Sequence, residues 1–320
     1  MREWLSKENT TAVNGFFICV VFLSHLGSYT DLAAWLTSCL SYIGQMMVVM
    51  FMFYSGFGVG ESIRKKGMKY VKSMPKNRIF RVWSHFAIAV TLYLVLGLIT
   101  GRTMSGKNIF LSYLAWEDLG NSNWYIFAIL GCYLATVLGC LTLGRKLDLL
   151  ASILYLTAFI CFLHAYKEPW WYNTIPAYGL GLIFSWKKCK EWNLWNRKVL
   201  VGILALASLL LWIGFHRLKG NLGLYLVMEF FFVLMILCLT CLLPVSQRGM
   251  LWLGKHLFEI YILMRIPMII LKKAGITNPW LMGGISGLAT LLMAWGFHKL
   301  LQKKQKQSTN FAEQKQTEKR

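Results

Sequence analysis

The chain has 320 residues, of which 57% are hydrophobic and 15% aromatic, and its 34 Lys and Arg against 13 Asp and Glu give a net charge of +21. The mean hydropathy of +0.51 is well above that of an ordinary soluble domain, so a soluble globular fold is excluded. The basic residues fall in short connections between apolar stretches, so the charge does not indicate binding to nucleic acid.

Apolar stretches of roughly 17 to 23 residues recur along the chain, and each can cross the hydrocarbon core of a membrane as a helix. The turn spacing of a membrane barrel is absent, so helices must satisfy the backbone in lipid. We therefore expect an all-α polytopic membrane protein of about ten transmembrane helices, with one domain over residues 1–301 and a disordered basic tail over residues 302–320. The expected spans are Thr11–Tyr29, Ser41–Gly60, Phe80–Thr100, Asn123–Leu143, Leu147–Ala165, Trp170–Trp186, Val199–Phe215, Leu222–Leu243, Leu251–Leu271 and Trp280–Leu301.

The distribution of Lys and Arg predicts the orientation of these spans. Loops on the cytoplasmic side of a membrane carry an excess of basic residues. Most of the 34 basic residues collect on one side when the amino terminus is placed in the cytoplasm. Both termini are therefore expected to be cytoplasmic.

His25 is an ionisable residue within the first expected span, where such residues are costly and mark functional sites. Asn14 lies about 16 Å earlier on nearly the same face of the helix. A neutral imidazole can take a proton from a hydroxyl, as the general base of an acyl transfer must do. The alternative is a packing histidine near the end of its helix.

Arg78 and Arg81 form an Arg-x-x-Arg element at the start of the third expected span, with His85 one turn later on the same face. These arginines could simply follow the positive-inside rule. Two guanidiniums one turn apart, preceded by the basic run from Arg64 to Lys76, would also suit the phosphates of coenzyme A.

Three further charged residues lie at membrane depth. Glu259 is expected to pair with His256, and Arg265 with Tyr261, so that this group has a structural role. Glu229 is the third, and a transporter or flippase that uses His25 and Glu229 as a proton relay is the competing hypothesis from another functional class.

Asn123 and Trp124 open the fourth expected span at its outer end. Aromatic residues at this depth commonly anchor a helix at the membrane interface. An aromatic face beside an amide group would also suit a sugar-like acceptor. Both interpretations remain open from the residues alone.

Several segments in this order resemble the bacterial integral-membrane acyltransferase family 3, which includes O-acetyltransferases of surface polysaccharides. They are SKENTTAVNGFFICVVFLSHL, VVMFMFYSGFGVGES, NRIFRVW, GNSNWYIFAILGCY, WYNTIPAYGLGLIFSWKK and LGKHLFEIYILM. Each segment is short and apolar, but six in the same order cover most of the chain. Asn14 stands where that family has a basic residue, and Met264 followed by Arg265 stands where it often has a histidine.

The resemblance implies a membrane-embedded O-acyltransferase that moves an acetyl group from acetyl-CoA to a hydroxyl of a glycan or lipid-linked sugar. It places the chain as a multi-pass protein in a bacterial inner membrane, with the bilayer as its surroundings and no metal cofactor. His25 would be the catalytic residue, and Arg78 and Arg81 would bind coenzyme A. Ser55 is a polar residue within the second expected span, and for that reason we expect it to line the route of the thioester. Asn14, Asn123 and Trp124 are the expected substrate-binding residues. Whether the chain forms a homo-oligomer is left open, as are the acceptor and the choice between direct transfer and an acyl-histidine intermediate.

Overall fold

The computed structural model describes residues 5–142, 147–187, 197–217, 222–242 and 247–317. These residues form helices and connections with no strand, as expected for an all-α protein. The helices are α1 (Lys7–Leu26), α2 (Ala34–Lys66), α3 (Met68–Met74), the π-helical turn η1 (Pro75–Phe80), α4 (Arg81–Ile99), α5 (Gly106–Tyr113), α6 (Trp124–Thr142), α7 (Asp148–Tyr166), the short η2 (Pro169–Trp171), α8 (Ile175–Trp186), α9 (Arg197–Arg217), α10 (Leu222–Leu242), α11 (Arg248–Lys255), α12 (Leu257–Leu263), α13 (Arg265–Lys273) and α14 (Pro279–Thr317).

Within the described parts of the chain, 7 helices are long and apolar enough to cross a membrane. The protein is therefore a multi-pass membrane protein. The spans are Lys7–Leu26, Ala34–Lys66, Met68–Ile99, Trp124–Thr142, Asp148–Tyr166, Gly223–Thr240 and Pro279–Gln302. The count of ten and the side on which each terminus lies remain predictions.

Two of the expected spans take other forms, for local reasons. The sixth is divided into η2 and the 12-residue helix α8, which has Pro176 in its first turn, where a proline cannot continue a helix from the residues before it. The seventh expected span, Val199–Phe215, falls within α9. The ninth is divided at His256 and Met264 into the three short helices α11, α12 and α13.

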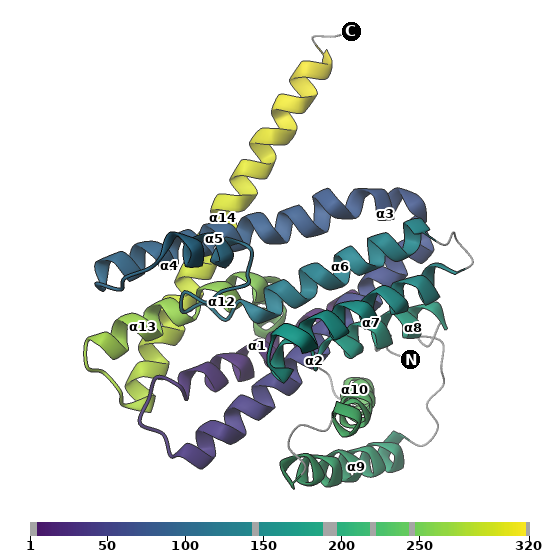
Figure 1. Cartoon of the computed structure of the whole chain (residues 1–320), viewed down its shortest axis with the longest axis horizontal. Helices are drawn as coiled ribbons and strands as arrows, with labels where there is room; N and C mark the ends of the chain where they lie inside the picture. The colour runs from purple at the N-terminus through teal and green to yellow at the C-terminus, as the bar shows by residue number, and fades with distance from the viewer. Residues whose placement is uncertain (1–4, 143–146, 188–196, 218–221, 243–246, 318–320) are drawn as a thin grey trace.

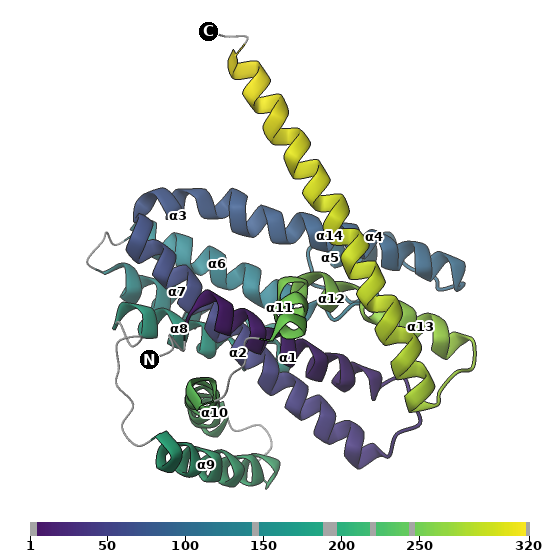
Figure 2. The same cartoon turned by 180° about the vertical axis from the view of Figure 1, so that it is seen from behind.

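Helices α1 and α2 form an antiparallel hairpin at the centre of the molecule (Figure 1). Figure 2 shows α11 lying across α1, and α10 lying beside α2 and α8 with α9 on its outer side. Helix α14 continues past the other helices to Thr317, away from the bundle. The domain boundary and the disorder expected from Gln302 onward remain predictions.

Glycines allow two of these helix pairs to approach closely. A Cβ atom on Gly15 would collide with the carbonyl of Met250, and one on Gly254 with the carbonyl of Thr11, so α1 and α11 meet backbone to backbone. The same reciprocal arrangement joins α2 to α8 at Gly56 and Gly181.

The two ends of the central hairpin differ in character. The end where α1 begins and α2 stops carries Arg64, Lys65 and Lys66, and we call it the basic side. The opposite end, where α1 stops, carries Tyr29, Asp118 and Arg265, and we call it the far side. Buried aromatic, Met and β-branched side chains fill the core between these two ends.

Candidate active site

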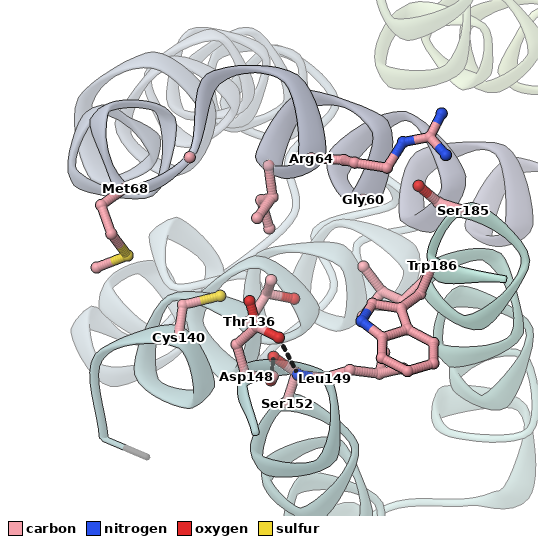
Figure 3. A pocket seen from close by; sticks show the side chains of 13 residues that line it. Gly60, Arg64, Met68, Thr136, Cys140, Asp148, Leu149, Ser152, Ser185 and Trp186 are labelled. Atoms are coloured by element: carbon pink, nitrogen blue, oxygen red, sulfur yellow. Dashed lines mark hydrogen bonds between the residues drawn. The ribbon is translucent and has the colours of Figure 1, made fainter. Parts of the chain in front are cut away.

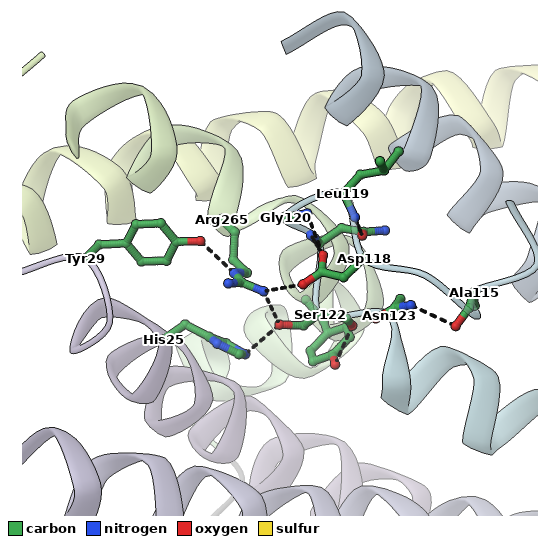
Figure 4. A network of polar contacts seen from close by, with 11 residues as sticks. His25, Tyr29, Ala115, Asp118, Leu119, Gly120, Ser122, Asn123 and Arg265 are labelled. Atoms are coloured by element: carbon green, nitrogen blue, oxygen red, sulfur yellow. Dashed lines mark hydrogen bonds and ion pairs between the residues drawn. The ribbon is translucent and has the colours of Figure 1, made fainter. Parts of the chain in front are cut away.

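His25 lies in the last turn of α1 and meets a loop that joins α5 to α6 (Figure 4). Its Nε2 is 3.4 Å from Ser122 Oγ, and which atom donates depends on the tautomer of the ring. Arg265, the first residue of α13, donates from its NH1 nitrogen to the same Ser122 oxygen at 2.9 Å. Three segments distant in sequence therefore converge on one hydroxyl.

A tight turn sets the course of this loop. One carboxylate oxygen of Asp118 accepts hydrogen bonds from the backbone N–H groups of Gly120 at 2.5 Å and Asn121 at 2.7 Å. The Asn121 side chain in turn accepts from the N–H of Leu119 at 3.1 Å. Gly120 has a φ of +106°, a conformation that residues with a Cβ rarely adopt. The turn thus depends on Asp118 and Gly120.

Two further hydrogen bonds hold the loop where α6 begins. The amide of Asn123 donates to the carbonyl of Ala115 at 2.8 Å, and Tyr261 donates from its hydroxyl to the carbonyl of Ser122 at 2.9 Å. Asn123 is only 3% exposed. Since its amide nitrogen is already used, the structure accounts for Asn123 as a residue that fixes the Ser122 loop, and its contact with substrate remains a prediction. Trp124 lies next to it, partly exposed, with its ring 6.3 Å from that of Tyr125.

Arg265 is held by groups other than the one expected. Its Nε donates to the Tyr29 hydroxyl at 2.8 Å, the guanidinium lies 5.5 Å from the centre of the Tyr29 ring, and NH1 is 4.0 Å from the Asp118 carboxylate. The expected partner, Tyr261, instead donates to Ser122. The helix is interrupted at Met264, and the Arg265 side chain therefore points toward Tyr29, at the end of α1, rather than toward Tyr261 in α12.

Glu259 also has a different partner. It lies 2.7 Å from His298 Nδ1 of α14, whereas His256 contacts the carbonyl of Trp252 at 2.8 Å. The prediction of a Glu259–His256 pair is wrong, because His256 lies at the break between α11 and α12, where its ring contacts the preceding helix. Within the described residues, no group of three or more His, Cys, Asp or Glu side chains is placed to hold a metal ion.

Asn14 lies toward the basic side on the stripe of α1 that bears His25. Its Oδ1 atom is buried and has no hydrogen-bond partner among the described residues. Ile18 and Phe22 occupy the interval between them and line an almost wholly apolar cavity of about 290 Å³, together with residues of α12 and α14. A buried polar atom without a hydrogen-bond partner, such as Asn14 Oδ1, is costly unless another group binds it.

Arg78 lies on the basic side in the π-helical turn that begins at Pro75. Such turns interrupt regular helices and are frequent at functional sites. Its Nε donates to the Tyr70 hydroxyl at 3.1 Å, and its guanidinium is 5.8 Å from the centre of the Tyr133 ring. Arg78 is partly buried against α6 as a result.

Arg81 has different surroundings from Arg78. Its side chain is exposed, and it lies within electrostatic range of His85. The His85 ring in turn lies 6.2 Å from that of Phe258 and 6.3 Å from that of Phe297, on α12 and α14. The π-helical turn therefore places Arg78 against α6, while Arg81 stays at the surface.

Ser55 lies between the Arg78 region and the His25 region. It is a partly buried residue of α2, and its hydroxyl is in polar contact with the tyrosines Tyr125 and Tyr133 of α6. The ring of Tyr125 packs edge-on against that of Tyr261 at 5.2 Å. Tyr261 leads to Ser122 and Tyr133 leads to Arg78, so polar side chains connect the two regions through the interior.

A pocket opens on the basic side between α2, α6, α7 and α8 (Figure 3). It has a volume of about 220 Å³, and its lining includes Arg64, Thr136, Ser185 and Trp186. The Thr136 hydroxyl is 2.9 Å from that of Tyr178, whose ring lies 6.1 Å from the Tyr133 ring beside Arg78. The pocket thus adjoins the basic end of the polar chain.

These features define a polytopic membrane protein with an internal polar site between a basic side and a histidine near the far side. A family model described as an acyltransferase domain, acyltransferase family 3, matches residues 12–299. The chain belongs to this family and is a membrane acyltransferase. Comparisons with curated proteins and with solved structures returned no match.

Sequence reasoning named His25, Arg78 and Ser55 as candidates but assigned no chemical role to Arg265 and did not consider Ser122 or Tyr29. An arginine within an apolar segment was the available signal for Arg265, since charged side chains at that depth are functional candidates. Ser122 and Tyr29 carried no comparable signal, because short polar residues in connections are common.

Proposed function

We propose that the chain transfers an acetyl group from acetyl-CoA to a hydroxyl of a surface glycan or a lipid-linked sugar. The observation that supports this best is the continuous series of polar side chains between Arg78 and His25. We expect these side chains to line the route along which the thioester of the donor reaches the acceptor through an otherwise apolar bundle.

In this proposal the basic side faces the cytoplasm, where coenzyme A is available, in a bacterial inner membrane. Arg78 binds a phosphate of coenzyme A, because a guanidinium offers several donors and a permanent charge. Arg81, exposed nearby, adds longer-range attraction for the same polyanion. The thioester then extends past Ser55 toward the far side.

In this proposal His25 is the catalytic residue. Its Nε2 accepts the proton of the acceptor hydroxyl as the oxygen attacks the thioester carbonyl, and it returns the proton to the departing thiolate of coenzyme A. The alternative route is transient transfer of the acetyl group to the imidazole itself. Asn14, with a buried oxygen free to accept a hydrogen bond within the described structure, lies on the same stripe as a substrate-binding group.

The transporter hypothesis has less support. Glu229 is 2% exposed on α10, and its electrostatic neighbours are Tyr42 and Tyr225 rather than any residue that contacts His25. A relay between Glu229 and His25 would need hydrogen-bonding groups that connect the two residues. The family also assigns the chain to acyl transfer.

The proposal is tested with labelled acetyl-CoA and the purified full chain in lipid nanodiscs. Wild-type protein should bind the label, His25→Ala should bind it equally well, and the double variant Arg78→Ala with Arg81→Ala should lose binding. Folding of each variant is checked by thermal unfolding and gel filtration. Absence of binding by folded wild-type protein would contradict the proposal.

A further inference from the structure

Arg265 has more hydrogen-bond donors than the described residues use. A guanidinium carries five N–H donors, of which one from Nε binds Tyr29 and one from NH1 binds Ser122. The Asp118 carboxylate, at 4.0 Å, is too distant for a further hydrogen bond. Three donors therefore lack a partner within the described structure, although the side chain is only 19% exposed.

The unused donors lie beside His25. Ser122 Oγ is 2.9 Å from the Arg265 NH1 nitrogen and 3.4 Å from His25 Nε2, so both groups contact the same hydroxyl (Figure 4). An arrangement that brings a base and a donor to one protein oxygen can also bring them to two neighbouring oxygens of a substrate. In acyl transfer these are the attacking hydroxyl and the carbonyl oxygen.

The position of the guanidinium is fixed before any substrate binds. Tyr29 holds it through a hydrogen bond and through its ring, and Ser122 holds it from a loop that Asp118 and Tyr261 anchor in turn. Donors that are already oriented stabilise developing charge without the cost of reorganisation. A residue needed only to neutralise Asp118 would not require this number of supports.

We propose that Arg265 is a second catalytic residue, which binds the oxyanion that forms on the thioester carbonyl oxygen. This inference rests on the proposed acyl transfer. His25 Nε2 takes the hydroxyl proton as the acceptor oxygen bonds to the carbonyl carbon, and the carbonyl electron pair moves to the oxygen that Arg265 binds. The carbonyl then re-forms, the carbon–sulfur bond breaks, and the thiolate takes the proton from His25 to give free coenzyme A.

The competing explanation is that Arg265 acts only through Ser122, by holding its hydroxyl against His25. The variants Arg265→Gln, Arg265→Lys and Ser122→Ala separate the two. Lys272→Gln is the matched control, because Lys272 is a second cation near the Tyr29 ring, at 5.6 Å, but is exposed and donates to the carbonyl of Ser28.

The measurement is release of free thiol from acetyl-CoA by each full-length variant in nanodiscs, with water as the probe acceptor, beside the dissociation constant for acetyl-CoA. Arg265→Gln should lower the release rate by roughly 100- to 1,000-fold while its affinity changes little, as expected for loss of an oxyanion donor. Ser122→Ala should lose less than about tenfold, and Lys272→Gln should stay within about twofold. Arg265→Lys should be intermediate, because one ammonium cannot reproduce the planar set of donors.

An unchanged rate in folded Arg265→Gln would overturn the inference, and so would a loss in Ser122→Ala as large as that in Arg265→Gln. If Arg265→Gln fails to fold, Arg265→Lys decides, and a wild-type rate in that variant would contradict the assignment. Wild-type protein that neither binds acetyl-CoA nor releases thiol would contradict the proposed function itself, which is a distinguishable result.

Discussion

The guanidinium of Arg78 lies 5.8 Å from the centre of the Tyr133 ring, whereas Arg81, three residues further on, is exposed at the surface. A partly buried arginine with fixed neighbours loses less freedom when it binds an anion than one that is free in water. The two arginines of the Arg-x-x-Arg element should therefore contribute unequally.

Arg78→Gln should weaken acetyl-CoA binding by about 10- to 100-fold, which corresponds to the loss of one or two charge-assisted hydrogen bonds. Arg81→Gln should weaken it by less than about tenfold, and that effect should fade as salt is raised. Isothermal titration calorimetry with acetyl-CoA at two salt concentrations distinguishes the two variants. Lys107→Gln is the control, because Lys107 is exposed on α5 and lies outside the basic run from Arg64 to Lys76. Equal losses in Arg78→Gln and Arg81→Gln would contradict the unequal roles.

The glycines of α2 provide a test of the helix packing. A Cβ on Gly56 would collide with the carbonyl of Tyr178, whereas one on Gly58 would meet nothing within 4 Å. Gly56→Ala should destabilise the protein by about 1 to 3 kcal/mol, since α2 and α8 must separate. Gly58→Ala should leave stability unchanged or raise it by up to about 1 kcal/mol, because alanine favours a helix. Thermal unfolding in detergent measures both, and the same shift in both would argue against this contact.

Asp118 should affect the reaction through the loop it holds. Asp118→Ala removes the acceptor for two backbone N–H groups, which should cost about 0.5 to 2 kcal/mol, as for other side chains that cap backbone donors. Because that loop positions Ser122 beside His25, thiol release should also fall. Glu117→Ala is the matched control, since no described side-chain hydrogen bond or ion pair of Glu117 is lost. A full rate in Asp118→Ala would show that the loop position is unimportant.

Glu229 distinguishes the enzyme from a proton-coupled transporter. Glu229→Gln keeps the shape of the side chain but cannot carry a proton as a carboxyl group does. Thiol release should stay within about twofold of wild type, because Glu229 has no described contact with the His25 region. A loss as large as that in His25→Ala would favour the relay.

The long spans could be predicted because an uninterrupted apolar stretch in lipid has few alternatives to a helix. Trp170–Trp186 and Leu251–Leu271 were less predictable. Hydropathy records that these segments are apolar, but the breaks at Pro176, His256 and Met264 depend on local backbone geometry and on what the flanking residues contact. The π-helical turn at Pro75 is a similar case.

The candidate site, like the fold, was predictable from the sequence only in part. His25 was identifiable because a histidine in an apolar helix requires an explanation. The partners of Arg265 were not, because Tyr29 and Ser122 lie 236 and 143 residues away from it in sequence. Periodicity relates residues within one helix, so it predicted Tyr261 as the neighbour of Arg265 and could not register a contact made between segments.

The central claim is that a thioester anchored at Arg78 reaches His25, and a cryo-EM structure of the full chain with a thioether analogue of acetyl-CoA tests it directly. The account predicts phosphate density against the Arg78 guanidinium and the acetyl carbonyl carbon within reach of an oxygen bound to His25 Nε2, about 3 to 3.5 Å between reacting atoms. An analogue bound with its acetyl group on the basic side, or in lipid away from His25, would contradict the account.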